Sequence, residues 1–417
     1  MRIRWLLALG LVFIILGSWG CVAVSRNASS SFDDTLNSIT GPYSFNIAAW
    51  EFNTLLREIG QRVTDPQPDP ALNSQSVVNY FSDVALLNNL KSGLGAVQAK
   101  QIQGDIDQYE ARIKEAESQI ASLKPIVEQT IASQIARTLA EQGIYNPFNN
   151  DWLQLPFPPV SFKLEKPLNV LVISPRDRIE RIRDIVIKPD LNTSQMVELE
   201  SSVEGLNVSA LVVQIGGTGA TYPSFVTDNA DLRFTVDAAV EEWLHQYLAF
   251  KPLGFRYVLD LLRISPKADI PTINETVAGI ASKEIGSMVY HQFYAQYQPA
   301  ETGEGGQAAG ADFVAAMREI RLNVNLFLAE GQIDRAEKYM EDQRQMLNAR
   351  GYNIRKLNQA YFAFYGSYAH SPTSIDPIGD QVSLLRKHSL SLKDFLDTAA
   401  NITGSQDLQN LVSLYGG

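Results

Sequence analysis

Cysteine and histidine are both scarce in this chain. Its 417 residues include one cysteine, Cys21, and four histidines. Because Cys21 lies within an apolar run near the N-terminus, the rest of the chain can form no internal disulfide bond and must be stabilised by packing. The same scarcity excludes a cysteine nucleophile from the body of the protein.

Positive charge is also in deficit. Lysine and arginine together number 35 against 46 aspartates and glutamates, a formal net charge of −11. A surface that follows a phosphate backbone needs an excess of positive charge, so we expect no nucleic-acid partner. The hydrophobic share of 45% and the charged share of 19% are nevertheless typical of a folded globular protein.

The N-terminus does contain a long apolar run. The 20 residues from Trp5 to Val24 carry no charge and follow Arg2 and Arg4. Such a run is long enough to span a bilayer, and the preceding arginines favour a cytoplasmic N-terminus with an extracytoplasmic body. We therefore predict a single-pass cell-membrane protein in which residues 1–31 form the anchor and its flank. A cleaved signal peptide and a lipoprotein attached through Cys21 are the alternatives.

Residues 32–150 are predicted to form a helical, coiled-coil-like region. Between Val97 and Gln142, apolar residues recur with helical spacing at Ile102, Ile106, Tyr109, Ile113, Ile120 and Leu123. This pattern predicts two long helices, broken or kinked near Pro125, that form a helical hairpin. The hairpin either packs on the main domain or forms a stalk that mediates homodimerisation, and both interpretations stay open.

Residues 151–417 combine strand patterns with helical patterns. Strand-like stretches occur in residues 160–174 and 206–226, where proline, asparagine and glycine bound the apolar runs. From about Leu232 onward the pattern is helical. This succession predicts an α+β fold in which a mixed sheet is followed by a mainly helical half.

The stretch VEEWLHQYLAF, Val240 to Phe250, places acidic residues ahead of a histidine. On a helix, Glu241 and His245 project from one face and Glu242 lies on its flank. The spacing is that of an H-E-x-x-H motif with glutamate in place of the first histidine. In that motif two ligands one turn apart hold zinc and the intervening glutamate acts as general base. The same string also fits an ordinary solvated helix face.

A third ligand is available downstream, in the stretch NETVAGIASKEIG. Together, EEWLHQYL and NETVAGIASKEIG resemble the two-helix core of gluzincin zinc metallopeptidases. The later RKLNQAYFAFYGSYA resembles a helix near the end of some bacterial aminopeptidase-like proteins. The resemblance covers about 200 residues, from Leu211 to Ala400. It implies a zincin-like half that binds Zn²⁺ and hydrolyses peptide bonds in a peptide or protein substrate.

Carried over by position, the resemblance makes Glu241, His245 and Glu275 the zinc ligands and Glu242 the general base. It departs from the family at Glu241, whose negative charge weakens the Lewis acidity of the ion. Tyr361 and Tyr365, one turn apart, become candidates for hydrogen-bonding the oxyanion of a tetrahedral intermediate. The glycine-containing stretch LVVQIGGTGATYPSFV becomes a candidate edge strand that pairs with the substrate backbone.

The leading hypothesis is therefore a membrane-anchored, extracytoplasmic, zinc-dependent peptidase. A second hypothesis is a catalytically inactive pseudo-peptidase that acts as an envelope-anchored binding or scaffolding protein. A third is a structural cell-envelope protein built on the helices at residues 97–142.

Overall fold

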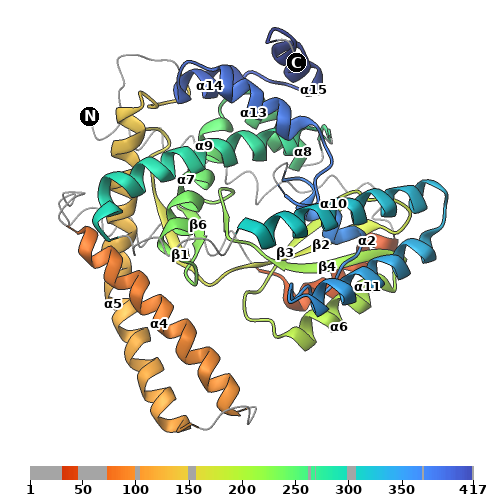
Figure 1. Cartoon of the computed structure of the whole chain (residues 1–417), viewed down its shortest axis with the longest axis horizontal. Helices are drawn as coiled ribbons and strands as arrows, with labels where there is room; N and C mark the ends of the chain where they lie inside the picture. The colour runs from red at the N-terminus through yellow and green to blue at the C-terminus, as the bar shows by residue number, and fades with distance from the viewer. Residues whose placement is uncertain are drawn as a thin grey trace. The chain divides into compact units, whose positions relative to one another are not determined.

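The chain folds into two compact units that interleave along the sequence. The computed structural model describes residues 31–45, 73–98, 104–148, 156–261, 264–267, 269–297, 307–368 and 371–415 (Figure 1). Unit 1 comprises Met1–Arg57, Leu168–Ile215 and Glu304–Pro377. Unit 2 comprises Glu58–Pro167, Gly216–Gly303 and Ile378–Gly417. The sequence predicted consecutive domains divided at residues 31 and 150, which differs from this interleaved arrangement.

Unit 1 is built around an antiparallel sheet of order β3-β2-β4. Its strands are β2 (Asn169–Pro175), β3 (Arg183–Ile187) and β4 (Val208–Gln214). Leu171 and Ile173 of β2 pack with residues of α2 (Ser31–Thr40) and α6 (Thr193–Glu204). Their neighbours Val170 and Val172 pack instead with α12 (Gln359–Tyr365). Because side chains alternate along a strand and both faces are covered, β2 reads as a continuous apolar run.

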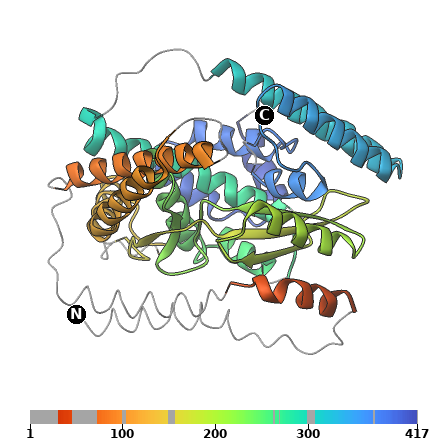
Figure 2. The same cartoon turned by 90° about the horizontal axis from the view of Figure 1, so that it is seen from below.

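Two further helices of unit 1 form an antiparallel pair. α10 (Gln307–Ala329) and α11 (Ile333–Ala349) lie side by side (Figure 2). Between them, Gly331 adopts a φ of +74°, a left-handed conformation that glycine reaches without strain. Met317 and Val324 of α10 and Met340 of α11 are fully buried in their common core.

Unit 2 contains a long helical hairpin. α4 (Ser74–Gln98) packs along α5 (Ile106–Glu141), and the two are drawn in orange and gold in Figure 1. The predicted break near Pro125 is wrong, because α5 runs through this residue. Val127, Ile131 and Ile135 follow it at helical spacing and are fully buried. Their packing offsets the cost of about 3 kcal/mol that an internal proline imposes.

The sheet of unit 2 is small and mixed. β1 (Phe162–Glu165) pairs in parallel with β6 (Ser224–Thr227), and β5 (Gly217–Thr218) pairs antiparallel with β6. β5 therefore lies at one edge of this sheet. Among the described residues there are two three-stranded sheets, one in each unit, where the sequence predicted a single mixed sheet. The α+β class itself is confirmed.

Further α-helices belong to the described part of unit 2. They are α7 (Leu232–Leu248), α8 (Pro252–Leu261), α9 (Asp269–Tyr294), α13 (Ile378–His388), α14 (Leu392–Ala399) and α15 (Ser405–Ser413). α9 is the central element, because it contacts α5, α7, α8 and the three C-terminal helices. Its apolar residues Ile273, Val277 and Ile285 are fully buried. This packing fixes the two helices that carry the predicted metal ligands.

Within the described ranges, no helix combines the length and the apolar character that a membrane span requires. This finding contradicts the prediction of an N-terminal transmembrane helix and of a single-pass membrane location. The long helix α5, for example, carries charged side chains along its length, whereas a span needs about 20 mostly apolar residues. The predicted segment from Trp5 to Val24, with Cys21, lies outside the described residues.

Gly254 allows α8 to begin directly against the end of α7. A Cβ atom at Gly254 would lie 2.2 Å from both the carbonyl carbon and the carbonyl oxygen of Leu248. Because these are backbone atoms, Gly254→Ala is expected to lower the free energy of unfolding by about 1–3 kcal/mol. Urea unfolding measures this change. Gly95→Ala is the matched control, since nothing lies within 4 Å of its Cβ position. That control should be neutral or slightly stabilising, and a Gly254→Ala protein as stable as the parent would refute the contact.

Candidate metal centre

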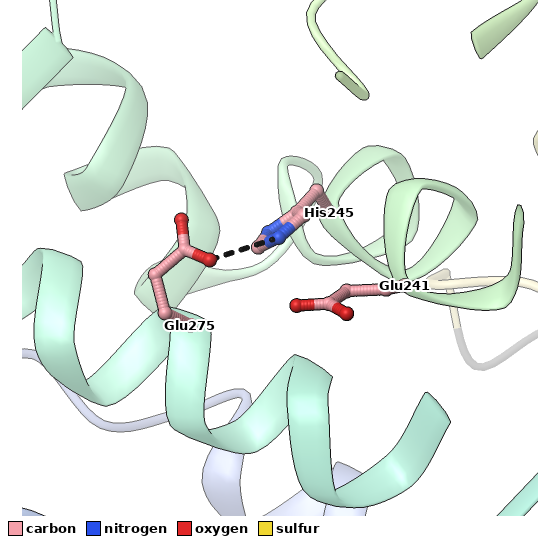
Figure 3. Close-up of side chains that lie close together, drawn as sticks. All are labelled: Glu241, His245 and Glu275. Atoms are coloured by element: carbon pink, nitrogen blue, oxygen red, sulfur yellow. Dashed lines mark ion pairs between the residues drawn. The ribbon is translucent and has the colours of Figure 1, made fainter. Parts of the chain in front are cut away.

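The structure brings the three predicted metal ligands together. Glu241 and His245 project from α7, and Glu275 projects from α9 toward them (Figure 3). One ligand atom from each residue lies within 4.8 Å of the other two. Nε2 of His245 lies 3.5 Å from Oε2 of Glu275. The three side chains are partly buried, so their charges interact through a medium less polar than water.

Helix packing explains why these side chains meet. Asp231 caps the N-terminus of α7 by accepting a hydrogen bond from the backbone N–H of Phe234. Val240 and Leu244 are fully buried in the core of unit 2, which turns the polar side of α7 toward α9. The facing side of α9 carries Gly279, whose Cβ position lies only 3.8 Å from Oε1 of Glu241. Gly279 therefore lies beside the Glu241 carboxylate, at ordinary van der Waals distance.

His245 is oriented by Asn274, the residue before Glu275. Nδ1 of His245 lies 2.7 Å from Oδ1 of Asn274, which is fully buried. An amide oxygen can only accept a hydrogen bond, so Nδ1 carries a proton. In the neutral imidazole this leaves the lone pair on Nε2, the atom that faces Glu275. The contact therefore presents His245 in the tautomer that a metal ligand needs.

Glu275 is held by a residue from a third helix. The hydroxyl of Tyr257, on α8, donates a hydrogen bond of 2.6 Å to Oε1 of Glu275. The ring of Tyr257 also lies beside the ring of His245, with 5.9 Å between their centres. Sequence reasoning gave no role to Tyr257, because no motif links it to the two ligand helices. Asn274 begins the stretch NETVAGIASKEIG, but no motif predicts a role for it either.

Glu242, the predicted general base, lies against the edge strand β5. A Cβ atom at Gly217 would be 2.6 Å from Oε1 of Glu242, and one at Gly219 would be 3.2 Å from Oε2. The backbone N–H of Gly219 donates a hydrogen bond to this carboxylate. The glycines of the predicted edge strand therefore allow it to approach the general base closely. Pairing of that edge with a substrate stays a prediction.

Tyr361 and Tyr365 lie elsewhere, on α12 of unit 1. Their ring centres are 4.5 Å apart, and burial raises the pKa of both hydroxyls. The metal ligands belong to unit 2. The predicted role of these tyrosines at an oxyanion stays a prediction.

The acidic residues of α7 retain protons more strongly than free carboxyl groups. Burial chiefly raises the pKa of Glu241 to about 7, and the charge of Glu275 adds to the effect. Burial likewise raises the pKa of Glu242 to about 8. Burial lowers the pKa of His245, but the charges of Glu275, Glu242 and Glu241 outweigh it and raise that pKa to about 10. At neutral pH the metal-free cluster therefore holds protons that a bound cation would displace.

These shifts predict how stability varies with pH in the metal-free protein. The folded pKa of Glu242, about 8, exceeds its ordinary value of 4.5, so the folded state binds this proton more tightly than the unfolded state. The resulting stabilisation is complete below pH 4.5 and is lost as the pH rises through about 8. With chelator present, the parent is expected to lose more stability than Glu242→Gln between about pH 5 and about pH 9. Urea unfolding across this range measures the difference, and equal slopes would contradict the assignment.

No family model, curated protein or solved structure matches the chain.

Proposed function

We propose that the protein is a zinc-dependent peptidase whose metal is held by Glu241, His245 and Glu275. The observation that carries the proposal is the convergence of three ligand atoms from two helices. Nitrogen and oxygen ligands bind tetrahedral zinc at about 2.0–2.1 Å, which places neighbouring ligand atoms about 3.4 Å apart. Nε2 of His245 and Oε2 of Glu275, at 3.5 Å, already have this separation. The ligand oxygen of Glu241 lies within 4.8 Å of both and would have to move closer to complete the set.

The donor set also fits a catalytic site. Two carboxylates and one imidazole are ligands that zinc accepts, and three protein ligands leave the fourth tetrahedral position for water or substrate. Asn274 supports His245 and Tyr257 supports Glu275 through hydrogen bonds. Supporting bonds of this kind fix ligand orientation in metal sites.

The residues around the site have separate chemical tasks. Zinc, when bound, would polarise the scissile carbonyl and increase the acidity of the attacking water. Glu242 would accept a proton from that water and deliver it to the leaving amine, as a general base and then a general acid. The backbone N–H of Gly219 favours the charged form of the Glu242 carboxylate. The outer edge of β5 offers an extended peptide a strand to pair with.

Metal analysis of the full chain, purified without chelators, tests the proposal. We expect one zinc ion per chain, and we expect His245→Ala and Glu275→Ala to weaken zinc binding by at least about tenfold. His291→Ala is the matched control, because His291 is an exposed histidine on α9 outside the cluster. A folded parent protein that binds no metal would exclude the enzymatic function.

A second candidate function follows from the protonation of His245. Its pKa of about 10 means that the metal-free cluster can hold an imidazolium ion next to Glu275, as a partly buried ion pair. Such an ion pair compensates the charge of Glu275 without a metal ion. The chain would then be an inactive relative of a peptidase that serves as a binding or scaffolding protein.

A further inference from the structure

The two oxygens of the Glu275 carboxylate face different partners. Oε1 accepts the hydrogen bond from Tyr257 at 2.6 Å, whereas Oε2 points to Nε2 of His245 at 3.5 Å. Tyr257 comes from α8, while the ligands come from α7 and α9. A third helix therefore decides which oxygen of Glu275 is directed at the metal position.

We propose that Tyr257 is a positioning residue that keeps Glu275 a one-oxygen ligand and so leaves one coordination position open. This inference rests on the metal site of the proposed function. A carboxylate can bind a cation through one oxygen or through both. An oxygen that already accepts a short hydrogen bond from a phenol is a poorer second ligand. With one oxygen from Glu275, the protein supplies three ligand atoms and water or substrate takes the fourth position.

The alternative arrangement shows what the hydroxyl prevents. If Glu275 turned to offer both oxygens, Glu241, His245 and Glu275 would together supply four ligand atoms. With its water still bound, the ion would then have five ligand atoms, which fills the position that a catalytic zinc uses when it expands to five-coordination. A single hydroxyl thus separates a four-coordinate site that can still accept substrate from a five-coordinate one that cannot.

The fold holds Tyr257 firmly enough for this task. Gly254, one turn earlier on α8, lies against the backbone of Leu248 at the end of α7. α8 also packs along α9, the helix that carries Glu275. The Tyr257 ring fills the space beside His245 at a centre-to-centre distance of 5.9 Å. Since both bonded side chains are partly buried, water competes weakly for their hydrogen bond.

Tyr257→Phe, made in the full-length chain, removes the hydroxyl and keeps the ring. Co²⁺ is the probe, because four-coordinate Co²⁺ absorbs visible light much more strongly than Co²⁺ with five or six ligands. We expect the visible band of the Co²⁺-loaded variant to be weaker than that of the parent. We also expect its Zn²⁺ affinity, measured by competition with a chromophoric chelator, to fall by about tenfold. Tyr290→Phe is the matched control, because Tyr290 is a partly buried tyrosine of α9 whose ring packs against Tyr294.

Each outcome has a distinct meaning. A weaker band in Tyr257→Phe together with an unchanged band in Tyr290→Phe supports the inference, because loss of packing alone would not change the coordination number. A Co²⁺ spectrum identical to that of the parent overturns the inference, whatever the affinity, and leaves the proposed function intact. A folded parent chain that binds neither Co²⁺ nor Zn²⁺ overturns the proposed function and the inference together.

Discussion

Replacing Glu242 with glutamine is expected to lower kcat for peptide hydrolysis by about 10²–10⁴-fold, the usual contribution of a general base. Glutamine keeps the size of the side chain but cannot accept a proton at neutral pH. Glu242 is not among the three converging ligands, so the variant should bind as much zinc as the parent. Loss of turnover with retained metal is the result that distinguishes a base from a ligand.

Hydrolysis of a denatured protein and of a mixed set of short peptides, followed by mass spectrometry, measures this effect. Zinc content is determined on the same samples. Glu319→Gln is the matched control, because Glu319 is an exposed glutamate of α10 in unit 1. Full activity in Glu242→Gln would remove Glu242 from the mechanism. Loss of zinc in this variant would make it a ligand instead.

The second large effect concerns Glu241. Glu241→His replaces a charged ligand by a neutral one and restores the H-E-x-x-H spacing on α7. Less negative charge on the ion increases the acidity of the attacking water, so the variant should keep its zinc and reach half-maximal rate at a pH lower by on the order of one unit. The pH dependence of kcat/KM for parent and variant measures the shift.

The same variant separates the two candidate functions. If the parent binds no zinc and the Glu241→His protein does, the result supports the metal-free binding or scaffolding function. In that case the parent lacks only a suitable ligand at position 241. Loss of an existing zinc ion in Glu241→His would show instead that the site depends on the glutamate. That result would contradict the expectation that histidine can replace Glu241 as a zinc ligand.

Some of the site could be predicted from the sequence because helix geometry is rigid. Glu241 and His245 lie four residues apart, and any helix brings such a pair to one face. Glu275 could be offered as a third ligand, but its position beside the other two could not be predicted, since it depends on how α9 packs on α7. Tyr257 and Gly219 were missed for the same reason, because their contacts with Glu275 and Glu242 arise from tertiary packing between helices and loops that local patterns do not encode.

The fold, like the site, could be predicted from the sequence only in part. The apolar runs of β2 and β4 were readable as strands, and their succession with helical patterns gave the α+β class. The helix break predicted near Pro125 is wrong, because burial of the helical residues that follow it outweighs the free-energy cost of a proline inside a helix. The interleaving of the two units has no local signal, since it depends on which distant segments share a core.

That interleaving has a consequence for the biosynthesis of the protein. Glu241, His245, Tyr257 and Glu275 all lie in the uninterrupted segment Gly216–Gly303, but α9 is also covered by helices from Ile378–Gly417. A nascent chain that ends before residue 378 contains every candidate ligand and lacks part of the core that holds them. Because a compact unit folds as a whole, the metal centre is completed only near the end of translation. During most of its synthesis, the growing polypeptide therefore contains the candidate ligands without the complete core that holds them together.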